Sequence, residues 1–458
     1  MNHYFIALLA VLSAPTLHAA TLDDPFGSLE GVAPTPCRRE QTAGLSVADA
    51  VDLALCVNPQ TREVWANARY QAAQVGIARS ALLPTLSANL SANQYSGSAF
   101  KREQSANLAL SWLVFDFGGR DATLESARQL FAAASASRDS TVQSVFQSTV
   151  QAYYQVHANE AALAAVRKSE QSYQESYKAA EARHQVGAAT PADKLQAQTA
   201  YSQASLVRIQ AEGALRAAQG GLAAIMGQDA HRPLSLAAAP TVTPGAEFEQ
   251  DVEALIATAR ELRPDLFAAE AQVRAAEADV AAASAAGMPT LSLGLAAGKS
   301  RIDGSAWDNN SYLGLAVTIP IFTGFSTTYK IKAAEAQREA KAASRDSLRL
   351  QVALDVWNAY QSLVTANQSL RSSADLLASA EQSEQVAVGR YKGGVGSILD
   401  LLSAQSALAA ARLQRVRALF NWNVSRTALA FAVGNLDTNL LSRLAETITN
   451  TTNAVTKP

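Results

Sequence analysis

The sequence offers few side chains that could perform catalysis. The segment 294–300, Gly-Leu-Ala-Ala-Gly-Lys-Ser, resembles a phosphate-binding loop, but only three residues separate its glycines instead of four. No helix is expected after it, so a bound phosphate would lack the helix N-terminus that such loops use. We interpret this segment as the end of a strand and a loop. No nucleophile elbow occurs elsewhere, so we expect neither catalytic residues nor an enzyme.

The histidines and acidic residues do not form an obvious metal site. His157, His184 and His231 are scattered, and none stands at a His/Glu or His/Cys spacing that would hold a metal ion. We therefore expect no bound metal and no cofactor. Charged residues make up only 17% of the 458 residues, and the formal net charge is -2. This balance argues against a highly charged disordered chain and against a polybasic nucleic-acid binder, so no nucleic-acid partner is expected.

The first twenty residues predict export from the cytoplasm. An apolar run over residues 4–12 is followed by small residues, as in a secretory signal peptide, although Lys and Arg are missing from its start. We expect the mature chain to begin near Ala20 or Thr21. No later segment has 18 consecutive strongly apolar residues, so no transmembrane helix is expected. If the protein crosses a membrane, it must do so as a β-barrel.

Two cysteines, Cys37 and Cys56, belong to the mature part of the chain. An oxidising periplasm would allow them to form a disulfide, which would stabilise the fold by roughly 3 kcal/mol in the chain-entropy model. The alternative is two separate buried thiols, because Cys56 stands in an apolar run.

The chain contains an internal repeat of about two hundred residues. The segment 81–87 recurs as 286–292 at an offset of 205, and 183–198 recurs as 390–405 at an offset of 207. Agreement in order and spacing over this length indicates two copies of one unit. We predict a signal peptide (1–20), an N-terminal segment (21–44), a first repeat (45–228), a linker (229–249), a second repeat (250–434) and a polar C-terminal tail (435–458).

Each repeat carries a very long helix. Neither Gly nor Pro occurs in 120–186 or in 326–388, and the apolar residues of the first segment recur with the 3.5-residue rhythm of a coiled coil. A helix of this length would extend roughly 95 to 100 Å. A turn follows each long helix, at 186–190 and 393–397, and leads into a second helix running back. An Ala-rich helical segment comes first in each repeat, beginning after a weak cap at Ser46 in the first and stopping at Pro84 or Pro289.

Two short strands precede each long helix. Alternating apolar residues predict strands at about 85–95 and 106–117 in the first repeat, and at about 290–299 and 311–322 in the second. The polar segments 96–105 and 300–311 are expected to be hairpin loops. Aromatic residues near the strand ends suggest the interfacial girdle of a barrel: Tyr95, Trp112, Phe115, Phe117, Tyr312 and Phe322.

Four strands cannot close a membrane barrel, because the smallest usual one has eight and an open edge cannot face lipid. The chain must therefore form oligomers, and three copies would supply twelve strands. The alternative is a small soluble sheet. A signal peptide together with such long helices favours the barrel.

The duplicated order of helix, strand hairpin, long helix, turn and helix resembles the TolC family of outer-membrane efflux and secretion ducts. Ala81-Leu-Leu-Pro-Thr-Leu86 before the first strand and Phe115-Asp-Phe-Gly-Gly119 after the second carry this resemblance, which covers essentially the whole mature chain. It implies a mainly α fold with a membrane β-barrel: a homotrimer with a 12-stranded barrel in outer-membrane lipid and a trimeric α-barrel spanning the periplasm. Expected partners are a periplasmic adaptor (membrane fusion) protein and an inner-membrane pump of the ABC or RND type.

The resemblance also implies a closable end at the helix turns. In the family this end is held by Asp, Tyr and Arg contacts and ringed by acidic residues. Asp193 and Asp400 occupy equivalent positions just after the two turns, and Tyr391 stands nine residues before Asp400. We expect these three residues at the pore constriction, where three-fold symmetry would make each Asp a ring of charge. Alternatively, both acids simply favour a helix first turn.

Two positions depart from the family pattern at this end. Gly396 stands where a gating Arg is expected, and Ser403 where a second acid is sometimes found. We therefore expect weaker contacts holding this end closed, and a single ring of acidic residues, from the second repeat. The cargo is a type I secreted protein, small toxic compounds or both. The missing lipid-attachment cysteine favours the secretion branch, by analogy alone.

A periplasmic coiled-coil structural or adaptor protein without a channel is the main alternative. It would explain the long helices and the signal peptide but not two equivalent strand pairs. Fractionation separates the two hypotheses. Heat-modifiable migration on a gel and insolubility in sarkosyl are expected for the barrel, whereas release of the protein by osmotic shock would contradict it.

Overall fold

The computed structural model describes residues 24–27, 29, 44–96, 101–232, 234–237 and 251–435. The predicted signal peptide, Cys37 and most of the predicted linker and tail lie outside them, so the disulfide with Cys56 stays a prediction. The described elements are α2 (Val47–Val57), α3 (Pro59–Ser80), β1 (Thr85–Tyr95), β2 (Lys101–Phe115), α4 (Gly119–Gln185), α5 (Pro191–Ile225), α6 (Val252–Leu262), α7 (Pro264–Ala285), β3 (Thr290–Ile302), β4 (Asp308–Thr318), α8 (Ser326–Lys392) and α9 (Ile398–Val433).

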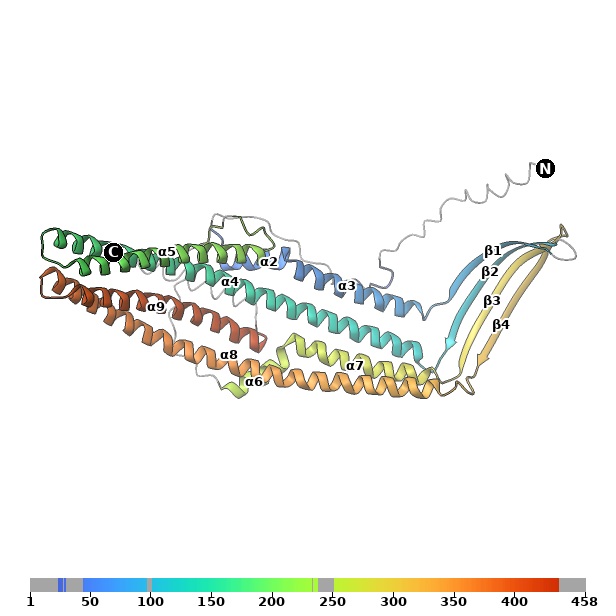
Figure 1. Cartoon of the computed structure of the whole chain (residues 1–458). Coiled ribbons are helices and arrows are strands. Elements are labelled where there is room, and N and C mark those ends of the chain that lie inside the picture. The colour runs from blue at the N-terminus through green and yellow to red at the C-terminus, as the bar shows by residue number, and fades with distance from the viewer. Residues whose placement is uncertain are drawn as a thin grey trace, which may run out of the picture. The chain divides into compact units, whose positions relative to one another are not determined.

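The same order of two helices, two strands, a long helix and a returning helix occurs twice (Figure 1). Both α4 and α8 have 67 residues, or about 100 Å at 1.5 Å per residue. Among the helices of the described part of the chain, none combines the length and hydropathy that a membrane span requires.

The first helical segment of each repeat is broken, whereas the sequence pattern predicted one uninterrupted segment. The breaks fall at Pro59 and Pro264, each of which is the first residue of the next helix. Proline fits there because its missing N–H would have no intrahelical partner, and it disfavours helical geometry in the residue before it. Asn58 accordingly has φ -57° and ψ 128°. Ser46 is a stronger cap than expected, because it forms a full capping box with Asp49.

By its contacts the chain divides into two units. The sheet unit is built mainly from residues 65–135 and 268–344, and the hairpin unit mainly from residues 136–267 and from 345 onward. The sheet is antiparallel with the order β1-β2-β3-β4, so β1 and β4 are its two edges.

The strands run further into the polar segments than the sequence pattern predicted. β2 begins at Lys101, and β3 and β4 extend to Ile302 and back to Asp308, so most of the residues expected in loops lie in the ladder. Hydrogen bonding between backbones continues where the alternation of apolar residues has stopped, because the ladder does not depend on side-chain type.

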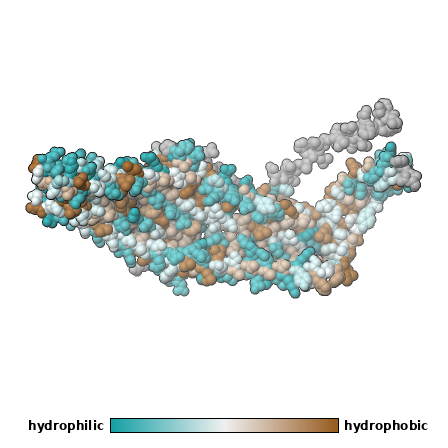
Figure 2. All heavy atoms as spheres, viewed as in Figure 1, coloured by the Kyte–Doolittle hydropathy of each residue, from teal (hydrophilic) through white to brown (hydrophobic). Residues whose placement is uncertain are grey.

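The register separates the residues of the sheet onto two different faces. One face, the apolar face, carries the leucines of all four strands, including Leu86, Leu108, Leu295 and Leu313, which are 45 to 72% exposed. The other, the polar face, carries Ser, Asn, Thr, Gly and Ala, as in the paired residues Asn89, Asn107, Gly298 and Asn310. Hydrophobic residues also gather where the sheet meets α8 (Figure 2).

Two of the aromatic residues expected in a girdle belong to the polar face instead. Tyr95 and Tyr312 alternate with the leucines along their strands. A Cβ atom added at Gly314 would collide with the Tyr312 hydroxyl, and one added at Gly294 would lie 3.4 Å from its ring. The ring of Tyr312 therefore lies against these two glycines.

In the sheet unit, helices of the two repeats lie next to each other. Arg120 Nη1 at the start of α4 donates to the carbonyl of Ala81, just after α3. Arg274 Nε of α7 donates to Gln129 Oε1 of α4 at 2.9 Å, and Lys341 Nζ of α8 donates to Gln272 Oε1 of α7 at 3.1 Å. The order across this unit is therefore α3, α4, α7, α8.

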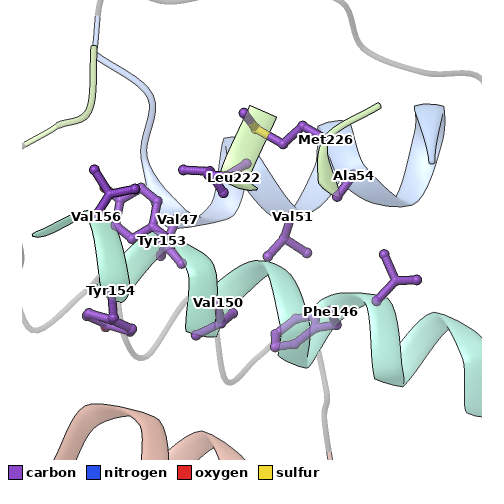
Figure 3. Packing of buried hydrophobic residues seen from close by; sticks show 12 residues of the cluster. Val47, Val51, Ala54, Phe146, Val150, Tyr153, Tyr154, Val156, Leu222 and Met226 are labelled. Carbon is purple, nitrogen blue, oxygen red and sulfur yellow. The ribbon is translucent and has the colours of Figure 1, made fainter. Parts of the chain in front are cut away.

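The hairpin unit has an apolar core in each repeat. In the first, α2 packs against α4 and α5 through Val51, Val150, Tyr153, Leu222 and Met226, all nearly inaccessible to solvent (Figure 3). The Tyr153 hydroxyl donates to the carbonyl of Leu45, and burial raises the pKa of this phenol to about 12. In the second repeat the core contains Val352, Val356, Leu363 and Trp422.

A glycine follows the returning helix of each repeat and touches the break between the first two helices. Gly227 has φ +69°, and a Cβ atom there would lie 2.9 Å from Val57 Cγ1 and 3.1 Å from the Val57 carbonyl carbon. Gly434, its repeat equivalent, has φ +80° and would bring a Cβ atom within 3.1 Å of the backbone of Leu262 and Arg263. Only glycine combines this backbone conformation with so close an approach.

We expect Gly227→Ala and Gly434→Ala each to destabilise the protein by about 2 kcal/mol, because the substitution adds a left-handed backbone strain to a steric clash. In detergent this should lower the melting temperature by about 2 °C or more. Gly213→Ala, inside α5 with nothing within 4 Å of the added atom, is the matched control and should leave the melting temperature unchanged or raise it. Equal effects at all three positions would show that neither the close contacts nor the positive φ of Gly227 and Gly434 matters for stability.

Candidate functional site at the helix turns

The two long hairpins, α4–α5 and α8–α9, end at turns that are built in the same way. Pro191 is the first residue of α5, and Thr190 before it forms a capping box with Asp193. Ser397 forms the same box with Asp400 at the start of α9. The side-chain oxygen of each cap accepts a hydrogen bond from the backbone N–H of its Asp, at 3.2 and 3.1 Å. The turns are thus fixed by local interactions that the sequence encodes within four residues.

Asp193 and Asp400 therefore have a structural role at helix starts. Asp193 Oδ2 accepts from the Thr190 N–H and hydroxyl, both at 2.9 Å. Asp400 Oδ2 accepts only a longer bond, 3.4 Å, from the Ser397 N–H, and its side chain is exposed. An exposed carboxylate with one weak contact remains able to attract cations.

Arg183 connects the two hairpins at this end. From the last turn of α4 its Nη2 donates to the carbonyl of Tyr391 at 2.6 Å and to that of Lys392 at 3.2 Å. Its guanidinium carbon also lies 4.4 Å from the centre of the Tyr391 ring. The arginine therefore donates to carbonyls at the end of α8, where that of Tyr391 also accepts from the Gly394 N–H at 3.1 Å. It also adds a cation–π contact.

Tyr391 is the buried partner in this contact. It is 6% exposed and packs with Ala180 of α4, Ala197 of α5, and Ile398 and Leu401 of α9, so all four helices of the two hairpins contribute to this cluster. Its hydroxyl is buried and has no hydrogen-bond partner among the described residues. Burial raises the pKa of Tyr391 above its ordinary value, and the nearby Arg183 offsets part of this rise.

A second polar contact joins the hairpins further along. Ser176 Oγ of α4 and the side-chain amide of Gln405 of α9 lie within hydrogen-bond distance, 3.0 Å from nitrogen and 3.2 Å from oxygen, and both side chains are buried. Together with Arg183, this contact makes the turn end of one repeat depend on the other.

The three residues singled out from the sequence thus lie at the same end of the hairpins, but in different environments. Tyr391 is in the interior, and the two acids cap helices. Arg183 was not among the residues predicted from the sequence. Its only signal was its position at the head of the segment that recurs at Arg390, which does not reveal that it reaches the other repeat. Gly396 stands where an arginine was expected, and a Cβ atom there would lie 3.1 Å from Arg390 Cβ and from the backbone nitrogen of Tyr391, so a side chain at this position would require these neighbours to shift.

Comparison with known proteins identifies the family. The model of a family described as outer membrane efflux protein matches residues 50–228 and 255–435, which is most of the chain. The chain belongs to the outer membrane efflux protein family. It is 32% identical over 414 residues to Protein CyaE of Bordetella pertussis, a match that covers 88% of this chain and 87% of that protein. It is 27% identical to outer membrane efflux protein BepC of Brucella suis, with 82% of each chain covered.

Solved structures of outer-membrane channels share the fold. The Campylobacter jejuni CmeC channel superposes with a TM-score of 0.78 at 18% identity and covers 91% of this chain and 95% of its own. Vibrio cholerae VceC gives a TM-score of 0.76 at 21% identity and covers 85% and 96%.

As an outer membrane efflux protein, the chain is an export channel located in the outer membrane and extending into the periplasm. This result favours the channel over the coiled-coil adaptor that the sequence left open. Proteins of this kind work with periplasmic adaptors and inner-membrane pumps. The family consists of transport channels and not of enzymes. Among the described residues, no group of three His, Cys, Asp or Glu side chains is placed to hold a metal ion.

We expect Arg183→Ala to loosen the end of α8. Two hydrogen bonds from a charged donor are lost there, and such bonds stabilise by about 1.5 to 3 kcal/mol. Backbone amides of 393–396 should exchange with deuterium about tenfold faster or more. Tyr391→Phe is the control, because it removes a hydroxyl that has no partner among the described residues, and it should leave these rates unchanged. A faster exchange in Tyr391→Phe than in Arg183→Ala would assign the contact to the phenol instead.

Proposed function

We propose that three copies of this chain form one export duct, with the sheets joined into a 12-stranded barrel and the long helices into a cylinder in the periplasm. The observation that carries this proposal is the two-faced sheet with two free edges. Its apolar face suits hydrocarbon, and its polar face of small residues suits a water-filled interior. An edge in lipid would leave backbone N–H and C=O groups without hydrogen bonds, so the edges must be covered by other copies.

The closable end of this duct lies at the helix turns. Arg183 and Tyr391 hold the two hairpins of one copy together, and the exposed Asp400 supplies a ring of three carboxylates at the narrow end. Asp193, which is more fully engaged by its cap, contributes less to this ring. A periplasmic adaptor docks here and joins the duct to an inner-membrane pump of the ABC or RND type. The cargo is a type I secreted protein, small toxic compounds or both.

Single-channel conductance of the detergent-purified protein in a planar bilayer, with its mass measured on the same sample, tests the duct. We expect a trimer with a small, cation-selective conductance, because a narrow ring of carboxylates concentrates cations. A monomer without channel activity would contradict the proposal.

Asp400→Asn should reduce the preference for cations over anions by about threefold or more and weaken block by multivalent cations, because the three charges of the ring are removed. Asp400→Glu is the control and should retain both properties, since it keeps the charge at nearly the same place. Unchanged selectivity in Asp400→Asn would leave this residue with its capping role alone.

A further inference from the structure

The outer end of the sheet lies away from the helices, where β2 begins at Lys101 and β3 ends at Ile302 (Figure 1). The long helices follow the opposite ends of the strands and extend into the periplasm, so in the proposed duct this end faces the outside of the cell. Side chains here meet the outer leaflet of the membrane from the apolar face and the mouth of the channel from the polar face.

Charged residues at this end are divided between the two faces of the sheet. The alternation along the strands places Arg102 of β2, and Lys299 and Arg301 of β3, on the apolar face beyond the leucines. The acidic strand residues Glu103 and Asp308 lie on the polar face. The apolar face of the described strands therefore ends in three positive charges and no negative one. We call these three residues the outer basic cluster.

The members of the outer basic cluster are neighbours. Lys299 and Arg301 are two residues apart on one face of β3, and Arg301 pairs in register with Gln104 of β2. Arg301 Nε donates to Gln104 Oε1 at 2.8 Å. Arg102 is the next residue of this face along β2. Positions two apart on a strand are separated by about 7 Å, and diagonal positions on paired strands by about 7 to 8 Å. Long basic side chains at these positions can contact one phosphorylated headgroup.

The outer basic cluster has no acidic partner. Among the described residues, no carboxylate forms an ion pair with any of its three side chains. Asp303, in the turn after β3, accepts instead from the backbone N–H of Arg102 at 2.7 Å. The helix end of the sheet differs, because Arg120 there forms an ion pair with Asp116 at 3.1 Å. Three neighbouring cations repel each other, so this surface favours a negative group that the chain does not supply.

The cluster stands at the edge of the apolar band. Lys299 pairs with Asn309 of β4, and the outward residues from there toward Ile319 include leucines that are about 70% exposed. The stretch from Asn309 to Ile319 would measure roughly 34 Å along the strand, or about 26 Å in height at the usual tilt of about 40°. The apolar band of an outer-membrane barrel is about 25 Å tall. The cluster therefore reaches the level of the lipid headgroups.

An aromatic ring supports one member of the cluster. The guanidinium carbon of Arg301 lies 5.0 Å from the centre of the Trp307 ring, and this tryptophan, between β3 and β4, is 47% exposed. Tryptophan is enriched at membrane–water interfaces, where one side of its ring is apolar and the other wet. Within the described part of the chain, only Nε of Arg301 has a hydrogen-bond partner, so both terminal nitrogens remain able to donate.

We infer that Arg102, Lys299 and Arg301 bind the phosphate groups of a phosphorylated glycolipid, lipopolysaccharide, in the outer leaflet of the outer membrane. The inference rests on the proposed duct, which places the apolar face in lipid. Phosphates supply the missing negative charge, and a guanidinium matches two phosphate oxygens at once. Basic clusters at a membrane edge bind anionic headgroups in this way. Phospholipids of the inner leaflet meet the opposite end of the sheet.

Binding of lipopolysaccharide to the delipidated, detergent-purified protein tests the site. Arg102→Gln/Lys299→Gln/Arg301→Gln should raise the Kd by about tenfold or more, because all three cations are lost. Lys101→Gln/Lys330→Gln/Lys332→Gln is the matched control, since it removes three exposed cations from the polar face and from α8. It should change the Kd by less than about twofold. Equal weakening in both variants, or an unchanged Kd in the first, would overturn the inference.

Varying the ligand identifies the group that is bound. Dephosphorylated lipopolysaccharide should bind the wild type at least about tenfold more weakly, and equal binding would overturn the role of the phosphates. Phosphatidylglycerol in the same detergent should bind at least about fivefold more weakly, and equal binding would make this a site for any anionic lipid. Inorganic phosphate in large excess should not compete, and competition would assign the site to free phosphate instead of a lipid.

A pair of single variants guards against a folding defect. Lys101 and Arg102 are adjacent in the sequence but lie on opposite faces of β2. Arg102→Gln should raise the Kd for lipopolysaccharide by about threefold or more, whereas Lys101→Gln should leave it unchanged. The reverse order would overturn the inference.

The oligomeric mass and the conductance, measured on the same samples, separate this inference from the proposed duct. A wild-type oligomer that conducts but does not prefer phosphorylated lipopolysaccharide would overturn the inference while the duct stands. A wild-type monomer without conductance would contradict the duct itself, and the inference with it.

Discussion

Inside a membrane, every backbone N–H and C=O group at the edge of a sheet needs a hydrogen-bond partner, and the rest of this structure depends on that requirement. A four-stranded sheet satisfies its two inner strands and leaves β1 and β4 with free edges. In hydrocarbon such an edge has no water to replace the missing partner. In the duct that we propose, neighbouring copies cover these two edges.

The helices of the two repeats also begin and end with the same local features. Each repeat uses a proline to start its second helix and a left-handed glycine, Gly227 or Gly434, to bring the returning helix against that break. Each hairpin turn is closed by a capping box. These features depend only on nearby residues, so each repeat contains its own set. The contacts that join the repeats are different, because Arg183 reaches Tyr391 without an equivalent contact running the other way among the described residues.

That asymmetry has a consequence for the channel. If both hairpins were held equally, opening would require every contact to break at once. Instead, Arg183 of the first repeat donates hydrogen bonds to carbonyls at the end of α8 in the second. Any helix end exposes such carbonyls. The contact therefore depends on one side chain and on the approach of two helices, which suits the closable end that we propose at these turns.

The sequence alone determined the elements whose signals are local or periodic: the two repeats, the long helices without Gly or Pro, the turns and the alternation of the strands. It also indicated the family and the end where Asp193, Tyr391 and Asp400 lie. It missed the break before Pro59, the true length of the strands and the polar-face position of Tyr312. It also missed Arg183. The length of a strand, the face on which a residue lies and the partners of a side chain depend on a neighbouring segment some two hundred residues away in the sequence. Only the tertiary structure decides which segment that is.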